Sequence, residues 1–188
     1  MDTVDAIKNR RSIRSFKNKA VSKEILQRII LMGTKAPSGK NRQPWYFLVL
    51  QDNAKRQLCA LLDKVASEKE KHAENIGSLR ISSNAIKESS AVLLVYNSFS
   101  KAEQDYNHYR LLMDTQSIGA AIQNIILAAE SFGLGSLWIC DIFQCDKEIA
   151  ALYNEPYELA AAVAVGYPNQ SPLERPRKSL DKIIEWIR

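Results

Sequence analysis

The chain has 188 residues, of which 46% are apolar and 25% charged, as in an ordinary globular protein, and we expect a single domain over residues 1–188. No apolar run approaches the roughly 18–20 residues of a membrane span, and the acidic N-terminus lacks the features of a secretory signal, so we expect a cytoplasmic protein without a membrane partner. The net charge of 26 − 21 = +5 lies in short clusters near both chain ends, not in the long basic stripe with interleaved aromatics that is typical of nucleic-acid binding.

The N-terminal part of the chain predicts two helices. Asp2 can cap a short first helix that ends near Arg10. Residues 22–34 carry an apolar stripe at helical spacing behind Ser22, a natural N-cap, which predicts the second helix. The small, polar residues 36–39 then break the helical pattern.

Strand and helix patterns alternate through the middle of the chain. Residues 45–50 are aromatic and β-branched, which favours a strand. Residues 53–72 return to helical spacing, whereas residues 73–90 are ambiguous and are compatible with a mobile lid or a broken helix. Residues 91–96 form a continuous apolar run, the pattern of a strand that is covered on both faces.

The last third predicts a long helix and two more strands. Residues 110–132 have little polar surface in their second half, which indicates a buried helix that Gly133 ends with a left-handed C-cap. Apolar strands are expected at 136–140 and 160–165, with a short helix at 146–153 between them. The resulting element order predicts a sheet of about four strands between layers of helices.

Cysteine and histidine are too sparse for a disulfide framework or a metal centre. We expect Cys59, Cys140 and Cys145 to be reduced, structural thiols, with a substrate-facing Cys140 as the alternative. His72 and His108 have no metal-binding spacing and are expected at the surface or at the ends of helices. The sequence therefore predicts no metal site.

Two arginine clusters suggest an anion site. If residues 10–14 are extended, Arg10, Ser12 and Arg14 point to one side, and guanidinium groups match the oxygens of a phosphate. Near the C-terminus, Pro176 separates Arg175 from Arg177, so that both could face the same anion. Each cluster alone is also compatible with a solvated basic loop.

Two further segments have small residues where a ligand could approach the backbone. Residues 36–45 form a polar loop that leads into a buried strand, so they suit a flat ligand or an ordinary turn. Gly133 and Gly135 form a Gly-x-Gly, but it lacks a third glycine and connects a helix to a strand, so we reject a dinucleotide-fold site. Trp138, in the following strand, is expected in the core.

Together these segments resemble the FMN-dependent nitroreductase family over about residues 3–183. The shared motifs, in order, are R-R-S-I-R-x-F at 10–16, A-P-S-x-x-N-x-Q-P-W at 36–45, G-L-G-x-x-W-I at 133–139, and G-Y-P at 166–168 followed by a basic-x-Arg at 175–177. The resemblance implies an α+β sandwich, with a central, mostly antiparallel sheet between helices, and an intertwined homodimer with FMN at the subunit interface.

The resemblance also implies the residues that would bind FMN. Arg10 would contact the phosphate, Arg14 would lie near the N1/O2 edge of the ring, and the C-terminal arginines would complete the phosphate site. The turn at 37–41 would reach the ring from the partner subunit, and the backbone at 139–141 would face N5 and O4. The full set is Arg10, Arg11, Ser12, Arg14, Pro37, Ser38, Gly39, Asn41, Ile139, Cys140, Asp141, Arg175 and Arg177.

The implied activity is hydride transfer from NAD(P)H to a nitroaromatic, quinone or similar acceptor by a ping-pong mechanism. The flavin would do the chemistry at N5, with no catalytic side chain and with Arg14 in a supporting role. One alternative keeps the fold but changes the reaction, to a peptide-azoline oxidase, a dehalogenase or a flavin-fragmenting enzyme. Another is a non-catalytic, basic nucleotide-binding protein. The acceptor and the choice between NADH and NADPH stay open.

Overall fold

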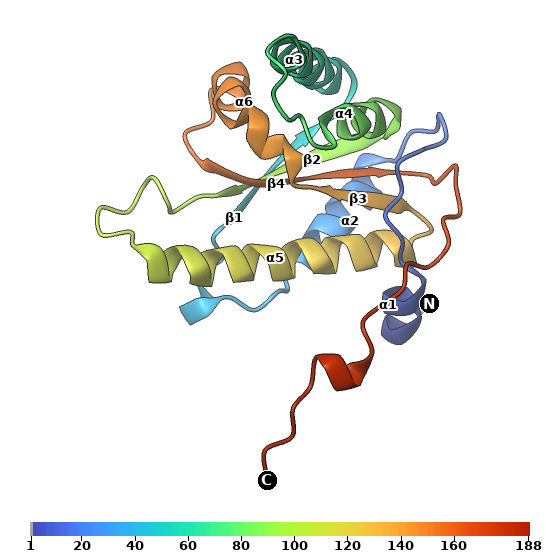
Figure 1. Cartoon of the computed structure of the whole chain (residues 1–188), viewed down its shortest axis with the longest axis vertical. Coiled ribbons are helices and arrows are strands. Elements are labelled where there is room, and N and C mark those ends of the chain that lie inside the picture. Colours follow the sequence, from blue (N-terminus) through green and yellow to red (C-terminus); the bar gives the residue numbers. More distant parts are fainter. Residues whose placement is uncertain (1) are drawn as a thin grey trace.

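The computed structural model describes residues 2–188, which form a four-stranded sheet covered by helices (Figure 1). The strands are β1 (Trp45–Leu50), β2 (Ala91–Asn97), β3 (Gly135–Ile139) and β4 (Glu158–Gly166). The α-helices are α1 (Thr3–Asn9), α2 (Lys23–Gly33), α3 (Asp52–Lys71), α4 (Leu79–Glu88), α5 (His108–Ser131) and α6 (Asp146–Tyr153). Short 3-10 turns are η1 (Gly39–Asn41), η2 (Asp141–Cys145) and η3 (Leu180–Lys182).

The sheet has the strand order β1-β2-β4-β3, and every neighbouring pair is antiparallel. Helices α3, α4 and α6 cover one face, and α2 and the long α5 cover the other (Figure 1). This arrangement confirms the expected α+β sandwich, with a sheet that is antiparallel throughout. β3 lies at one edge of the sheet, so the backbone groups on its outer side can pair with a segment from elsewhere in the chain.

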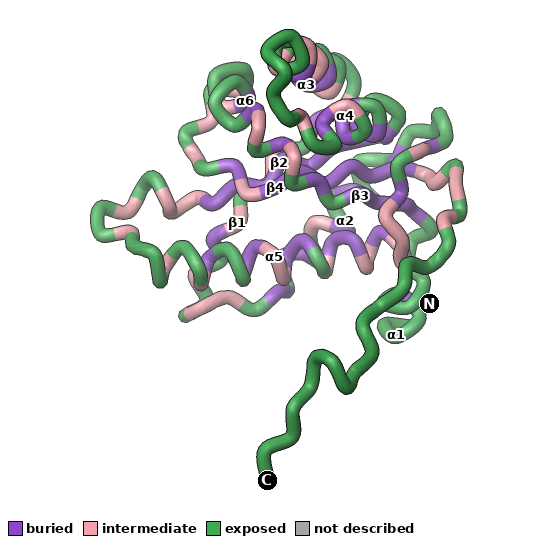
Figure 2. The backbone as a smooth tube through the Cα atoms, viewed as in Figure 1, coloured by how far each residue is buried: buried purple, intermediate pink, exposed green. Residues whose placement is uncertain are grey.

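The sheet separates two apolar cores, one on each face, and its central strand β2 is buried along its length (Figure 2). Successive side chains of a strand point to opposite faces, so Leu94 packs with Leu62 of α3 in one core. Leu93 packs with Ile122 of α5 in the other. All seven residues of β2 are buried, as the unbroken apolar run predicts.

The local signals for helix ends are confirmed. Asp2 Oδ1 accepts a hydrogen bond from the N–H of Asp5 at 2.8 Å, and Ser22 Oγ accepts one from the N–H of Ile25 at 3.4 Å. Gly133 follows α5 with φ of +71°, the left-handed conformation that glycine adopts without steric cost.

The ambiguous region 73–90 contains a packed helix, so the mobile-lid alternative is wrong for α4. Leu79, Ala85 and Ile86 are fully buried on one face of this helix. Arg80 Nη2 also pairs with Glu70 Oε2 of α3 at 2.7 Å. The scattered apolar residues of this segment form one face only when they are wound at helical spacing, which makes the pattern weak in the linear sequence.

The two ends of the chain meet beside the sheet. Residue Phe16 forms a β-bridge with Pro168, and its N–H donates to Glu88 Oε2 at 2.9 Å. Beyond residue 170 the chain leaves the body as an exposed tail (Figures 1 and 2). No helix within residues 2–188 is both long and apolar enough to cross a membrane.

Candidate functional site

An extended N-terminal segment runs alongside β3. Ser12 forms a parallel bridge with Ser136, and the N–H of Ile13 donates to the Ser136 carbonyl at 2.9 Å. The Ile13 side chain is buried against Gly135, where an added Cβ would lie only 2.7 Å from Ile13 Cγ1. Because extended backbone alternates its side chains, burying Ile13 turns Ser12 and Arg14 to the opposite, open side.

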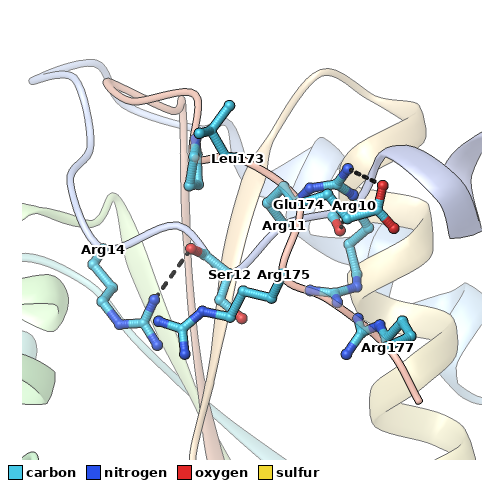
Figure 3. A pocket seen from close by; sticks show the side chains of 9 residues that line it. Arg10, Arg11, Ser12, Arg14, Leu173, Glu174, Arg175 and Arg177 are labelled. Atoms are coloured by element: carbon cyan, nitrogen blue, oxygen red, sulfur yellow. Dashed lines mark hydrogen bonds and ion pairs between the residues drawn. The ribbon is translucent and has the colours of Figure 1, made fainter.

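Both arginine clusters line one cleft on that open side (Figure 3). The C-terminal segment after β4 returns to the N-terminal segment, and the guanidinium groups of Arg14 and Arg175 point toward each other. The cleft encloses about 240 Å³. Its lining residues are Arg10, Arg11, Ser12, Arg14, Pro172, Leu173, Glu174, Arg175 and Arg177. The predicted convergence of the two clusters is therefore correct.

Positive charge in the cleft is largely uncompensated. Arg11 Nη2 pairs with Glu174 Oε2 at 3.5 Å. Within residues 2–188 the other four arginines of the cleft form no ion pair with a carboxylate, and Arg14 Nη1 only donates to the Ser12 carbonyl at 3.4 Å. Five arginines and one glutamate leave an excess of four positive charges. Such a group of forked donors is suited to a phosphate.

Sequence reasoning missed the acidic and apolar members of the cleft. Glu174 supplies a partner for Arg11, and Leu173 supplies an apolar wall. Glu174 directly precedes Arg175, so a lone acid inside a basic cluster was a usable signal for an internal counter-ion. Leu173 had no comparable signal, because an isolated leucine in a loop is common at protein surfaces.

The turn at 36–44 lies elsewhere in the same chain. It packs beneath the first half of α5, whereas α1 lies near the other end of that helix (Figure 1). The expected residues Pro37, Ser38, Gly39 and Asn41 therefore do not line the arginine cleft of their own subunit. The structure separates these two parts of the expected site within one chain.

The end of β3 supplies the third expected part. Ile139 is buried, Cys140 is exposed, and Asp141 is half-buried where the strand passes into η2. Partial burial, and then the nearby Asp141, raise the pKa of the Cys140 thiol. The core assignment of Trp138 is wrong: its side chain is 39% exposed, because β3 is an edge strand.

The model of the Nitroreductase family matches residues 7–167, which include the arginine segment, the turn at 36–44 and all four strands. The chain belongs to the nitroreductase family. The sandwich fold of the chain and the order of its four motifs agree with that assignment.

Individual relatives match most or nearly all of the chain. An Archaeoglobus fulgidus protein named as an NADH dehydrogenase/NAD(P)H nitroreductase is 29% identical, over 86% of this chain and 83% of its own. An iodotyrosine deiodinase of Thermotoga neapolitana is 30% identical, over 94% of each chain. Among solved structures, a nitroreductase-type protein of Desulfovibrio desulfuricans in complex with FMN is 30% identical, with a TM-score of 0.77 over 100% of this chain and 98% of its own.

Proposed function

We propose that this protein is an FMN-dependent oxidoreductase that passes hydride from NAD(P)H to a nitroaromatic, quinone or similar organic acceptor. The observation that carries the proposal is the arginine cleft, where residues from both ends of the chain leave four positive charges without carboxylate partners. The named relatives and the FMN complex of the Desulfovibrio protein support this choice.

The residues of the cleft fit the phosphate of FMN. Arg10, Arg175 and Arg177 would hold it through charge-assisted hydrogen bonds, which are roughly twice as strong as neutral ones. Arg11 is held by Glu174 and would contribute mainly long-range attraction. The hydroxyl of Ser12, which faces the same cleft, is free to donate a further hydrogen bond to the phosphate or the ribityl chain.

Residues further along β3 would receive the flavin ring. When bound, FMN supplies a ring that accepts hydride at N5 and carries negative charge near N1 and O2 once reduced. Arg14 would provide a fixed cation for that charge, a form of electrostatic preorganisation. The backbone at 139–141 would offer hydrogen-bonding groups to N5 and O4.

A second subunit would complete the site. The cleft of one chain, at about 240 Å³, is smaller than the roughly 300–1,000 Å³ of typical small-molecule sites. The C-terminal tail exposes Leu173, Trp186 and Ile187, each at 81% or more, and large exposed apolar groups on an extended arm call for a covering surface. In the homodimer we propose, the C-terminal tail would pack against the surface of the partner subunit, and the turn at 37–41 would cover the partner's flavin.

The first experiment is a flavin titration of the purified protein. We expect a yellow protein, or a colourless one that takes up added FMN with quenching of flavin fluorescence. Anaerobic stopped-flow mixing with NADH and with NADPH then tests the electron donor, because rapid bleaching near 450 nm reports reduction of the flavin. A protein that takes up no FMN would contradict the proposal.

A dehalogenase is the second candidate, favoured by the 30% identity to the iodotyrosine deiodinase over 94% of each chain. It would use the same flavin site and replace a carbon–halogen bond of a halogenated tyrosine with a carbon–hydrogen bond, releasing halide. Halide release from iodotyrosine by the dithionite-reduced holoprotein would favour this reaction. Fast bleaching by NAD(P)H and turnover of a nitroaromatic without halide release would favour the first.

A further inference from the structure

A buried ion pair anchors the turn 38–43 to α5. Arg42 Nε donates to Asp114 Oδ1 at 3.1 Å, and Arg42 Nη2 donates to Asp114 Oδ2 at 3.2 Å. The Asp114 side chain is fully buried, and that of Arg42 is 19% exposed. The forked geometry fixes the orientation of the guanidinium group as well as its position, which a lysine could not do.

Two side chains of the segment between β2 and α5 hold Arg42 from its other side. Glu103 Oε1 lies 2.9 Å from Arg42 Nη2, and the guanidinium carbon stacks 4.5 Å from the centre of the Phe99 ring. The hydrogen bonds that Arg42 donates to Asp114 and then to Glu103 raise the pKa of Arg42, and the bond from Arg42 lowers the pKa of Glu103. Arg42 is therefore paired with one carboxylate from α5 and one from the segment before it.

A third hydrogen bond completes the environment of Asp114. The Tyr106 hydroxyl donates to Asp114 Oδ2 at 3.2 Å and accepts from Asn97 Nδ2 at 2.7 Å. The buried carboxylate thus receives three hydrogen bonds, two from Arg42 and one from Tyr106. A buried ion pair is costly unless its groups are hydrogen-bonded, and here both oxygens of the buried carboxylate accept hydrogen bonds.

The turn that this pair holds is strained. Lys40, Asn41 and Gln43 have φ of +53°, +54° and +51°, the left-handed region that residues other than glycine rarely adopt. Ser38 Oγ accepts from the N–H of Gln43 at 3.0 Å, and a Cβ at Gly39 would overlap Met113 of α5. Such conformations persist only where surrounding contacts over-determine them, and they cluster at ligand sites.

We propose that Arg42 and Asp114 are positioning residues that hold the turn 38–43 in the strained shape that meets the flavin ring. The inference rests on the proposed function, because it takes this turn to cover the flavin of the partner subunit. A hydrophobic pair could stabilise the fold as well as an ion pair, whereas a bidentate pair also imposes one conformation on the turn. Arg42 would touch no flavin atom and would act through the backbone around Asn41.

The test compares FMN and riboflavin, because the two ligands share the ring and differ in the phosphate. Arg42→Lys keeps the positive charge and removes the pair of hydrogen bonds to the two oxygens of Asp114. We expect it to weaken binding of both ligands by the same factor, about tenfold, and to shift the visible band of bound FMN toward that of free FMN. The flavin-free variant should still unfold cooperatively, at a somewhat lower urea concentration than the wild type, because Asp114 loses one hydrogen bond. The control is Arg80→Lys, which breaks the forked pair with Glu70 on the α3–α4 surface and should change neither ligand's affinity.

A second variant tests the same inference if Arg42→Lys does not fold. Tyr106→Phe removes one hydrogen bond from Asp114 and leaves the ion pair intact, so FMN binding should fall about threefold, with the same loss for riboflavin. Folded variants that bind both flavins like the wild type would overturn the positioning role while the proposed function stands. A wild-type protein that binds no FMN would instead overturn the proposed function and, with it, this inference.

Discussion

Ser12 and Ser136 form a parallel β-bridge that holds the N-terminal arginine segment against β3, the edge strand of the sheet. Because of this bridge, Arg14 faces Arg175 across the cleft (Figure 3). The edge strand therefore positions the arginine segment beside the cleft. In the proposed function the phosphate of FMN lies in the arginine cleft and the flavin ring lies further along β3, so substitutions at these two ends of the edge should have different effects.

The phosphate end is tested by Arg177→Ala. If Arg177 contacts the phosphate of FMN, its loss should weaken FMN binding about 10- to 100-fold, since it removes a charge-assisted hydrogen bond. Riboflavin has no phosphate, so its binding should not change. Fluorescence titration with both flavins measures the difference. Arg56→Ala on α3 is the control, and an equal loss for both flavins would contradict a phosphate contact.

The ring end is tested by Arg14→Ala. A fixed cation beside N1 and O2 favours the reduced, anionic flavin, so its removal should make the midpoint potential more negative by about 30–60 mV, where about 30 mV corresponds to a tenfold change for a two-electron couple. Spectroelectrochemical titration of the holoprotein gives the value. Arg14→Lys should restore part of the shift, and a potential unchanged in Arg14→Ala would remove the assigned role.

The contact between Ile13 and β3 is tested by Gly135→Ala. The added Cβ would lie 2.7–3.0 Å from three atoms of Ile13, so we expect a loss of about 1–3 kcal/mol in the free energy of unfolding from overpacking. FMN binding should weaken as well, because the arginine segment is displaced. Thermal unfolding and flavin titration measure the two effects.

Gly119→Ala is the matched comparison within α5. Its added Cβ would meet only Trp138 at 3.8 Å, an ordinary contact. Replacing a glycine inside a helix should stabilise the fold by about 0.5–1 kcal/mol and leave FMN binding unchanged. If both alanine variants behaved alike, the close packing at Gly135 would not explain the result.

The stability of the fold should decline in alkali through Cys145. Burial, and then the nearby Glu148, raise the pKa of this thiol from 9.0 to about 11. The folded state therefore holds the proton more tightly than the unfolded chain does. The resulting stabilisation is fully present below pH 9 and is lost as the pH rises through 11.

Urea unfolding at pH 8 and at pH 10.5 measures this loss. The free energy of unfolding should fall less between these two pH values in Cys145→Ala than in the wild type. The stability of the variant should still fall somewhat with pH, because burial also raises the pKa of Tyr153 to about 12. A variant whose stability falls with pH as steeply as the wild type would show that Cys145 does not contribute.

Local patterns in the chain were enough for most of the secondary structure. Ser22 caps α2 through an atom three residues away, and Gly133 ends α5 through its own backbone. The unbroken apolar run of β2 likewise predicted a strand covered on both faces. These features depend on neighbours within a few residues, so the sequence alone predicts them. Trp138 was assigned to the core wrongly because the edge position of β3 is not a local property.

Motif order within the linear chain was also enough to identify the nitroreductase family and to expect that distant arginines act together. The tertiary structure alone showed that Arg10 and Arg177 share one cleft, that Glu174 neutralises Arg11 there, and that Arg42 meets Asp114 beneath the strained turn. Each of these contacts joins residues far apart along the chain. Their geometry comes from the packing of α5 and the tail around the sheet, and no periodicity or propensity encodes it.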